Sequence, residues 1–266
     1  MNFLVAIILG LIQGITEFLP VSSSGHVFIF SRLFNNPSSF EFDVLVSFGT
    51  LLAVIIYYRK RLLGIIQDIF RRRDLSLALK LVVASIPAVI AGFFFQDLIE
   101  LYLHNLGTVI CMMILVGVLM ILSERWKPKK LAVNKELHGI SYKQSLLVGL
   151  AQCFSLISGS SRSGVTMLAS IGMGFERKVA AEWSFLMSIP IILGASLKVL
   201  VSADGIRFVQ QNTATFLVAN VVAFVSGMLA IHILLKILSN KGLYWFGWYR
   251  IALATILVIL VVVGVL

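Results

Sequence analysis

The sequence predicts an all-α polytopic membrane protein with six transmembrane helices and two re-entrant helix hairpins, arranged as an inverted repeat. Three observations predict it: the composition, a series of long apolar segments, and two broken segments that resemble each other. Of the 266 residues, 59% are hydrophobic and 13% are charged, whereas soluble domains have about 45–50% apolar and about 25% charged residues. The apolar runs are continuous and do not alternate with polar residues, which argues against a transmembrane β-barrel.

The net charge of +10 is explained by loops rich in Lys and Arg on the cytoplasmic side of a membrane. We therefore expect membrane lipid, and no nucleic acid, as a partner. The two cysteines, Cys111 and Cys153, lie in apolar segments with neither metal-ligand nor disulfide spacing. The apolar first residues lack the basic stretch and the cleavage site of a signal peptide, so we assign them to the mature fold.

The first broken segment begins as an apolar run over residues 3–19, which Glu17 and Pro20 interrupt. Residues 27–34 are also apolar but are too few to span a bilayer, which takes about 20 residues. We expect a helix, a break at 20–25 and a short return helix. Such a re-entrant hairpin is tolerated only where it is buried in protein or lines a watery cavity.

The rest of the chain predicts six full spans and a second broken segment. The spans are residues 41–58, 77–96, 106–123, 179–201, 213–237 and 244–266, with Pro87 and Pro190 inside two of them. The second broken segment is an apolar run over 144–157, a break at 158–164 and a return over 165–175. The predicted organisation is a first half (1–124), a polar cytoplasmic linker (125–143) and a second half (144–266) within one membrane domain.

The positive-inside rule places the basic loops 59–76, 124–143 and 236–243 in the cytoplasm. The loops 35–40, 97–105 and 202–212 then face outside, and so do both termini. The first hairpin enters the membrane from outside and the second from the cytoplasm.

An internal repeat relates the two broken segments. A shift of 139 residues aligns Gln13 with Gln152, Ser22 with Ser161, Ser24 with Ser163 and Gly25 with Gly164. A shift of 141 then aligns Ser47 with Ser188. The spans that follow the two segments run in opposite directions, so the repeat is inverted. Inverted repeats with discontinuous helices place a binding site near the midplane of the membrane, where the repeats meet.

The two copies differ at the positions that matter for chemistry. The differing pairs are Glu17 and Leu156, Ser23 and Arg162, and His26 and Val165. One copy supplies an acid and an imidazole, and the other supplies a guanidinium. Because ionisable groups at membrane depth are costly and tend to be functional, we expect one pocket that contains Glu17, His26 and Arg162.

Arg162 lies in a break rich in glycine and serine at the start of a helix, a setting that suits a phosphate. Further candidate substrate-binding residues are Gln13, Ser24, Gly25, Ser161, Ser163, Gly164 and Thr166. The alternative is that the serines cap the broken helix ends.

His26 is a candidate nucleophile, general acid or base, and its alternative role is structural. Glu17 would orient the imidazole or act as a base toward a serine or water; alternatively it forms an ion pair with Arg162 that locks the hairpins. Gln13, one turn before Glu17 on the same helix face, would bind substrate or help to hold a metal. The nucleophile stays open among His26, Ser22, Ser23 and water.

Other polar and aromatic residues are interpreted as structural. His104 lies in a loop without an acidic neighbour. The pattern of Trp183, Trp245, Trp248, Tyr244 and Tyr249 is typical of the aromatic belts at membrane interfaces.

The motifs QGITEFLPVSSSGH (13–26) and SGSSRSGVT (158–166) resemble those of the undecaprenyl pyrophosphate phosphatase family, the bacitracin-resistance type. The resemblance covers the whole chain, including SIPA at 85–88, FLMSIP at 185–190 and the pair Tyr249-Arg250. It departs from the family at Gln13, where an acid is usual, and at Ser158, where proline is usual.

The resemblance implies a multi-pass enzyme of the bacterial inner membrane that removes the terminal phosphate of a C55 isoprenyl pyrophosphate at the outer face. This reaction recycles the lipid carrier for cell-wall synthesis. The resemblance implies that the family's acidic motif falls on Gln13 and Glu17, its histidine on His26 and its arginine on Arg162 with flanking Ser161 and Ser163. The predicted catalytic residues are Glu17, His26 and Arg162, with Ser22 and Ser23 as candidate nucleophiles. It also implies a divalent cation, Mg²⁺ or Ca²⁺, with Glu17 as a candidate ligand, and it leaves a homodimer open.

Two other functions compete with this one. The type-2 phosphatidic acid phosphatases need a second histidine six residues after the arginine, where this chain has Leu168, so they are excluded. An inverted-repeat transporter or flippase for an anionic polyisoprenyl phosphate has the same architecture. Phosphate transport does not need the Glu17 and His26 pair, which therefore favours the phosphatase.

Overall fold

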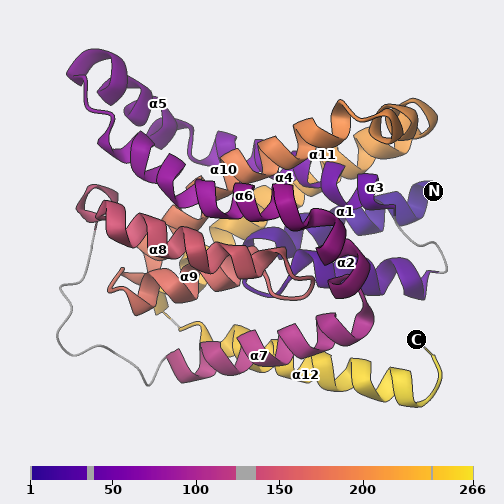
Figure 1. Cartoon of the computed structure of the whole chain (residues 1–266). Coiled ribbons are helices and arrows are strands. Elements are labelled where there is room, and N and C mark those ends of the chain that lie inside the picture. The colour runs from indigo at the N-terminus through magenta and orange to yellow at the C-terminus, as the bar shows by residue number, and fades with distance from the viewer. Residues whose placement is uncertain (1, 35–38, 124–135, 241, 266) are drawn as a thin grey trace.

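The computed structural model is helical, and the residues that it describes include six helices that are long and apolar enough to cross a membrane. It describes residues 2–34, 39–123, 136–240 and 242–265, and no strand occurs in these ranges (Figure 1). The candidate spans are Phe40–Tyr57, Ser76–Phe95, Leu106–Ser123, Arg177–Leu200, Ala203–Leu238 and Tyr244–Val262. The prediction of an all-α protein with six apolar spans is confirmed.

Each predicted broken segment consists of two helices joined by a non-helical turn. The first comprises α1 (Phe3–Phe18) and α2 (Ser23–Leu33). The second comprises α8 (Tyr142–Gln152), a 3₁₀ turn (Cys153–Leu156) and α9 (Arg162–Gly172). Helix α1 packs against α2, and α8 packs against α9.

The long helices follow the predicted spans. They are α3 and α4 (Phe40–Leu45 and Ser47–Tyr57), α6 (Ser76–Leu103), α7 (Leu106–Ser123), α10 (Arg177–Leu200), α11 (Ala203–Asn240) and α12 (Tyr244–Val262). Pro87 and Pro190 lie inside α6 and α10.

Two predicted loops contain helix. The basic loop 59–76 forms α5 (Arg59–Gln67) and a π-helical turn (Asp68–Arg72), and Figure 1 shows α5 extending from one corner of the bundle. The loop 202–212 is mostly the start of α11, which Asp204 favours from its first turn. A non-helical conformation at Asn212 separates it from the rest of α11. The loop at 202–212 was predicted from its polar residues. Polar segments can nevertheless form helices in water, as this one does.

Most of the predicted linker lies outside the described residues, which resume at residue 136. Its end forms a 3₁₀ turn (Leu137–Gly139) and then a capping box, in which Ser141 and Gln144 bond each other's backbone at the start of α8.

Helices from the two halves pack against each other in a reciprocal manner. Helix α1 lies along α11, and α8 lies along α6. Both contacts depend on glycine: a Cβ on Gly10 would stand 2.4 Å from the carbonyl oxygen of Ala219, and one on Gly149 would stand 2.4 Å from that of Ala84. Small residues let membrane helices approach this closely. Gly10 and Gly149 are the positions that the 139-residue shift aligns.

The largest hydrophobic cluster surrounds the two breaks and includes Phe18, Trp183 and Phe185. Trp183 is fully buried, so its assignment to an interfacial belt is wrong; its ring fills the space inside the bundle. Helix α1 begins and α12 ends at one end of the bundle, and α5 lies at the opposite end (Figure 1).

Candidate active site

The two breaks have the same backbone conformation at the serine that precedes the second helix of each pair. Ser22 has φ 76° and ψ 91°, and Ser161 has φ 73° and ψ 107°. Each serine caps the helix that follows: Ser22 Oγ accepts from the Gly25 N–H (3.3 Å) and Ser161 Oγ accepts from the Gly164 N–H (3.1 Å). The capping alternative therefore holds for these two serines. A positive φ costs a residue other than glycine about 1–3 kcal/mol and is found most often at functional sites.

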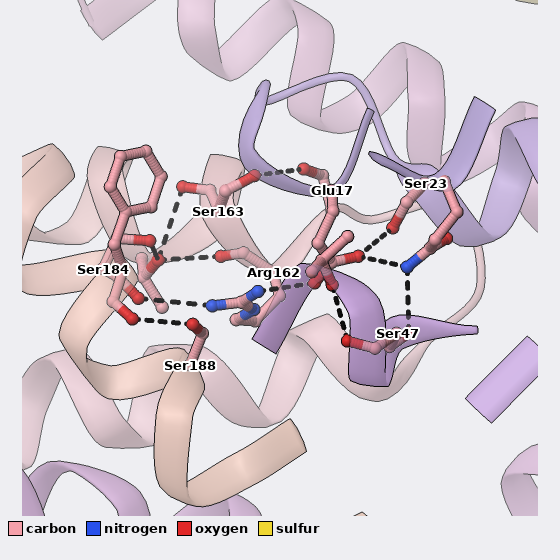
Figure 2. Close-up of polar contacts among 12 residues, drawn as sticks. Glu17, Ser23, Ser47, Arg162, Ser163, Ser184 and Ser188 are labelled. Carbon is pink, nitrogen blue, oxygen red and sulfur yellow. Dashed lines mark hydrogen bonds and ion pairs between the residues drawn. The ribbon is translucent and has the colours of Figure 1, made fainter. Parts of the chain in front are cut away.

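The turns make Ser23 the first residue of α2 and Arg162 the first residue of α9, and both side chains reach Glu17 (Figure 2). Ser23 Oγ donates to Glu17 Oε2 at 2.6 Å, and Arg162 Nη2 donates to Oε1 at 2.6 Å. The carboxylate thus lies beside the N-termini of two helices, whose dipoles favour negative charge. The side chains of Glu17 and Arg162 are 10% and 12% exposed.

Gln13 completes the surroundings of Glu17. Its Nε2 donates to Glu17 Oε2 (2.8 Å) and to Ser47 Oγ (2.9 Å). The two residues lie one turn apart on the same face of α1, as the sequence predicts. Three donors therefore hold one largely buried carboxylate, as a charge in a low-dielectric setting requires.

A second set of contacts fixes Arg162. Its Nη1 donates to the Ser184 carbonyl (3.2 Å), and Thr166 Oγ1 lies 2.8 Å from the Arg162 carbonyl and 2.7 Å from Ser184 Oγ. Ser163 Oγ donates to the Leu19 carbonyl (3.0 Å) and so joins the second break to the first. Thr166 and Ser163 are fully buried and support the arginine and the junction, while Ser24 is exposed at the start of α2.

The imidazole of His26 bonds partners other than Glu17. Nδ1 lies 2.7 Å from the Ser22 carbonyl and Nε2 lies 2.7 Å from Tyr249 Oη. Within the described residues no hydrogen bond joins His26 to Glu17. The expectation that Glu17 orients the imidazole is therefore wrong, because a backbone carbonyl and a tyrosine from α12 occupy both ring nitrogens. Glu17 and His26 therefore belong to two separate sets of contacts, one with Arg162 and the other with Tyr249.

Arg250 connects both breaks to α7. It is fully buried, and its guanidinium donates to backbone carbonyls on three segments. These carbonyls belong to Pro20 (3.4 Å), Gly159 (2.7 Å), Ser160 (3.2 Å), Met112 (3.1 Å) and Met113 (3.3 Å). Sequence reasoning noted Arg250 only as part of a resemblance. The sequence feature that could have identified Arg250 is its position as a cation inside the last apolar span, residues 244–266.

Other site residues were missed or undervalued. Ser47 had a signal, since the repeat aligns it with Ser188, but nothing in the sequence pointed to Ser184. His104, interpreted as structural, bonds Ser158 Oγ at 2.9 Å and so contacts the second break. Tyr249 was assigned to an interfacial belt, although its hydroxyl bonds His26.

An apolar groove of about 660 Å³ adjoins the first break. It lies between the end of α1, the end of α11 and the start of α12. Its lining residues are Ile15, Thr16, Leu19, Val21, Lys236, Ile237, Trp245, Phe246 and Tyr249. Tyr249 therefore belongs both to the groove wall and to the hydrogen bond with His26.

The donor atoms at Glu17 are compatible with a hard cation that also binds the substrate. Among the described residues no group of three or more His, Cys, Asp or Glu side chains is placed to hold a metal. Mg²⁺, however, is commonly bound through one or two carboxylates together with substrate phosphates. Glu17, with the hydroxyls of Ser23 and Ser47 nearby, offers one carboxylate and neutral oxygens of the type that Mg²⁺ and Ca²⁺ prefer.

Comparison with known proteins agrees with the motifs at the site. The family model described as "Bacitracin resistance protein BacA" matches residues 6–256, which include both breaks and Arg250. An undecaprenyl-diphosphatase of Thermosipho africanus is 38% identical over 255 residues, 94% of this chain and 97% of the relative. One from Methanococcus vannielii is 36% identical over 247 residues, 91% of this chain and 94% of the relative. With a match that spans nearly the whole chain and both halves of the site, the chain belongs to the bacitracin resistance protein BacA family.

Proposed function

We propose that this protein is an undecaprenyl-diphosphatase, a membrane phosphatase that removes the terminal phosphate of a C55 isoprenyl pyrophosphate and so recycles the lipid carrier for cell-wall synthesis. The family and the names of its relatives support this activity. The observation that carries it is the position of Glu17, whose two oxygens contact the Arg162 guanidinium and the Ser23 hydroxyl at 2.6 Å each.

Arg162 is the residue that would bind the pyrophosphate. The Ser184 carbonyl holds one nitrogen of its guanidinium, and Glu17 occupies another. An incoming phosphate would compete with Glu17 for the arginine, assisted by the dipole of α9. Substrate binding would thus release the Glu17 carboxylate from its ion pair with Arg162 and leave it beside Ser23.

The chemical step follows from the Ser23 contact. Glu17 takes the proton from Ser23 Oγ, or from a water in its place, as that oxygen attacks the terminal phosphorus. The bond between this phosphorus and the bridging oxygen breaks, and the lipid monophosphate leaves with the proton that Glu17 passes to it. Where a water attacks, inorganic phosphate is released in the same step. Where Ser23 attacks, the phosphoryl group stays on Ser23 Oγ until a water, deprotonated by Glu17, displaces it as inorganic phosphate and restores the hydroxyl. Ser22 is less suited to attack, because its hydroxyl caps α2 and is buried.

A divalent cation, Mg²⁺ or Ca²⁺, would be held by Glu17 together with substrate oxygens. The cation would neutralise part of the negative charge on the pyrophosphate. This part of the proposal rests on the single carboxylate and the oxygen donors around it.

We also propose that the α1–α2 and α8–α9 pairs are re-entrant hairpins of an inverted repeat. The matched turns at Ser22 and Ser161, the matched glycines at 10 and 149, and the reciprocal packing on α11 and α6 support this arrangement. With the basic end in the cytoplasm, both termini lie at the outer face, which is also where the family resemblance implies that the site opens. A homodimer stays a prediction.

Transport of an anionic polyisoprenyl phosphate is the second candidate function. The apolar groove favours it, because it leads from the first break to the junction of α11 and α12, near the basic end of the bundle. The Ser23–Glu17 contact favours hydrolysis, since a transporter has no need of a polarised hydroxyl.

The test is phosphate release by purified protein from C55 and C15 isoprenyl pyrophosphates, with the lipid product identified by mass. We expect lipid monophosphate and one phosphate per turnover, loss of activity with a chelator, and recovery with Mg²⁺ or Ca²⁺. Movement of intact lipid phosphate between vesicle leaflets without phosphate release would instead support transport.

A further inference from the structure

His26 is held at both ring nitrogens by groups of different character. It is 4% exposed, Nδ1 lies 2.7 Å from the Ser22 carbonyl, and Nε2 lies 2.7 Å from Tyr249 Oη. The two rings are nearly parallel, with an angle of 5° and a centroid distance of 5.8 Å. The imidazole therefore has one position and little freedom to rotate.

These contacts select one tautomer of the neutral ring. A carbonyl oxygen only accepts hydrogen bonds, so Nδ1 must carry the proton and donate to Ser22. Nε2 is then an acceptor, and the Tyr249 hydroxyl donates to it. Which nitrogen is protonated in a histidine is set by the hydrogen bond that the other nitrogen makes. Here Tyr249 keeps the lone pair on Nε2.

The second break shows that the local turn does not need this pair. Ser161 has the same conformation as Ser22 and the same cap, yet Val165 stands where the first break has His26. In both breaks the main-chain N–H of that residue donates to the cap serine's carbonyl, at 3.1 Å for His26 and 2.9 Å for Val165. The turn can therefore form without an imidazole or a tyrosine partner at this position.

Helix α12 fixes the tyrosine relative to both breaks. The next residue, Arg250, bonds the carbonyls of Pro20 in the first break and of Gly159 and Ser160 in the second. Tyr249 itself is 46% exposed and lines the apolar groove. A lipid in the groove can therefore contact Tyr249, whereas His26 lies behind it.

From this geometry we propose that Tyr249 is a positioning residue for the reaction, whose hydroxyl holds His26 in the Nδ1-protonated tautomer with Nε2 as the acceptor. The proposal rests on the proposed phosphatase function. It assigns to α12 a part in the site that the two motifs do not contain: through Tyr249, α12 orients the imidazole of His26, which in turn bonds the carbonyl of Ser22 in the first break.

The first test replaces only the hydroxyl. Tyr249→Phe keeps the ring and should lower kcat by about 10- to 100-fold, as loss of a partner that orients a functional histidine does, with KM nearly unchanged. Trp248→Phe, at an exposed neighbouring position on α12, is the matched control and should keep the wild-type kcat. An unchanged kcat in Tyr249→Phe, with the fold intact, would overturn the proposal.

The second test asks whether Tyr249 acts through His26. In a His26→Gln background, Tyr249→Phe should cause no further loss in single-turnover rate, because residues that act as a unit are not additive. Independent, multiplicative losses would contradict the proposal.

A spectroscopic measurement covers the case in which His26→Gln is inactive. In wild-type protein labelled with ¹⁵N-histidine, the His26 resonances, assigned by their absence in His26→Gln, should show the Nδ1–H tautomer alone. In Tyr249→Phe the resonance of the unprotonated Nε2 should shift, because this nitrogen loses its hydrogen-bond donor, while the Ser22 carbonyl keeps the proton on Nδ1; an unchanged spectrum would overturn the assignment. If the wild-type protein releases no phosphate, the proposed function is wrong. The spectroscopic measurement does not depend on that activity and tests the contact between Tyr249 and His26 separately.

Discussion

At the scale of single residues, the site depends on one carboxylate that is buried yet fully bonded. Glu17 accepts from Arg162, Ser23 and Gln13. The sequence predicted that Glu17 and Arg162 meet, because an acid and a cation stood at matching depth in two related breaks. It also aligned Ser23 with Arg162, but only the turns at Ser22 and Ser161 show that both residues begin their helices and contact the same carboxylate.

Replacing Ser23 tests which hydroxyl takes part in the reaction. Ser23→Ala removes the group that donates to Glu17 Oε2, and we expect kcat to fall by about 100-fold or more, as loss of a positioned acid–base partner does. Ser31→Ala, on the same helix and with its hydroxyl bonded to the Phe28 carbonyl, is the control and should retain activity. Full activity in Ser23→Ala would show that a water or another side chain attacks.

His26 shows what a sequence motif does not reveal. Its neighbours in sequence suggested Glu17 as its partner, whereas the structure gives it Tyr249, 223 residues away. No periodicity or spacing connects two residues so far apart. The same holds for Arg250, whose partners are backbone carbonyls, which leave no trace in the side-chain pattern.

At the scale of elements, the breaks are held in place by close helix contacts on either side. The carbonyl of Ala84 would stand 2.4 Å from a Cβ on Gly149, so α8 can lie on α6 only without a side chain at this position. The self-comparison aligned Gly149 with Gly10 but could not show what each glycine contacts, because α6 and α11 occupy equivalent places only in three dimensions.

Gly149→Ala should therefore separate α8 from α6. We expect a loss of stability of about 1–3 kcal/mol, typical of overpacking, measured as a lower midpoint of thermal unfolding in detergent. Gly194→Ala is the matched control, since nothing lies within 4 Å of the added Cβ inside α10. It should be neutral or more stable by up to about 1 kcal/mol. Equal effects of the two changes would mean that the α6–α8 contact is looser than the structure shows.

At the scale of the whole molecule, the number and type of spans followed from hydropathy, while the polar segments were less predictable. Hydropathy identifies spans well because backbone groups in lipid must bond within a helix. No such constraint applies to polar segments, and Arg59–Gln67 and the start of α11 proved helical. The orientation of the protein in the membrane stays a prediction, which rests on the basic loops alone.

Cysteine labelling tests this arrangement. With Cys111 and Cys153 replaced by alanine, Lys60→Cys in α5 and Arg207→Cys near the start of α11 introduce single exposed thiols. In intact cells an impermeant maleimide should label position 207 and leave position 60 unlabelled until the membrane is opened. The reverse pattern would invert the topology and place the site's opening at the other face.

The central claim is that Glu17 from the first break and Arg162 from the second form one catalytic site. The most direct measurement is the rate of phosphate release from C55 isoprenyl pyrophosphate by wild-type protein, Glu17→Gln and Arg162→Lys, each checked for folding against the control Ser31→Ala. We predict turnover by the wild-type protein and by the control. Both site variants should lose about 100-fold or more, because glutamine cannot accept a proton and lysine cannot bridge Glu17 and Ser184 as the guanidinium does. Near wild-type turnover in either folded variant would contradict the account.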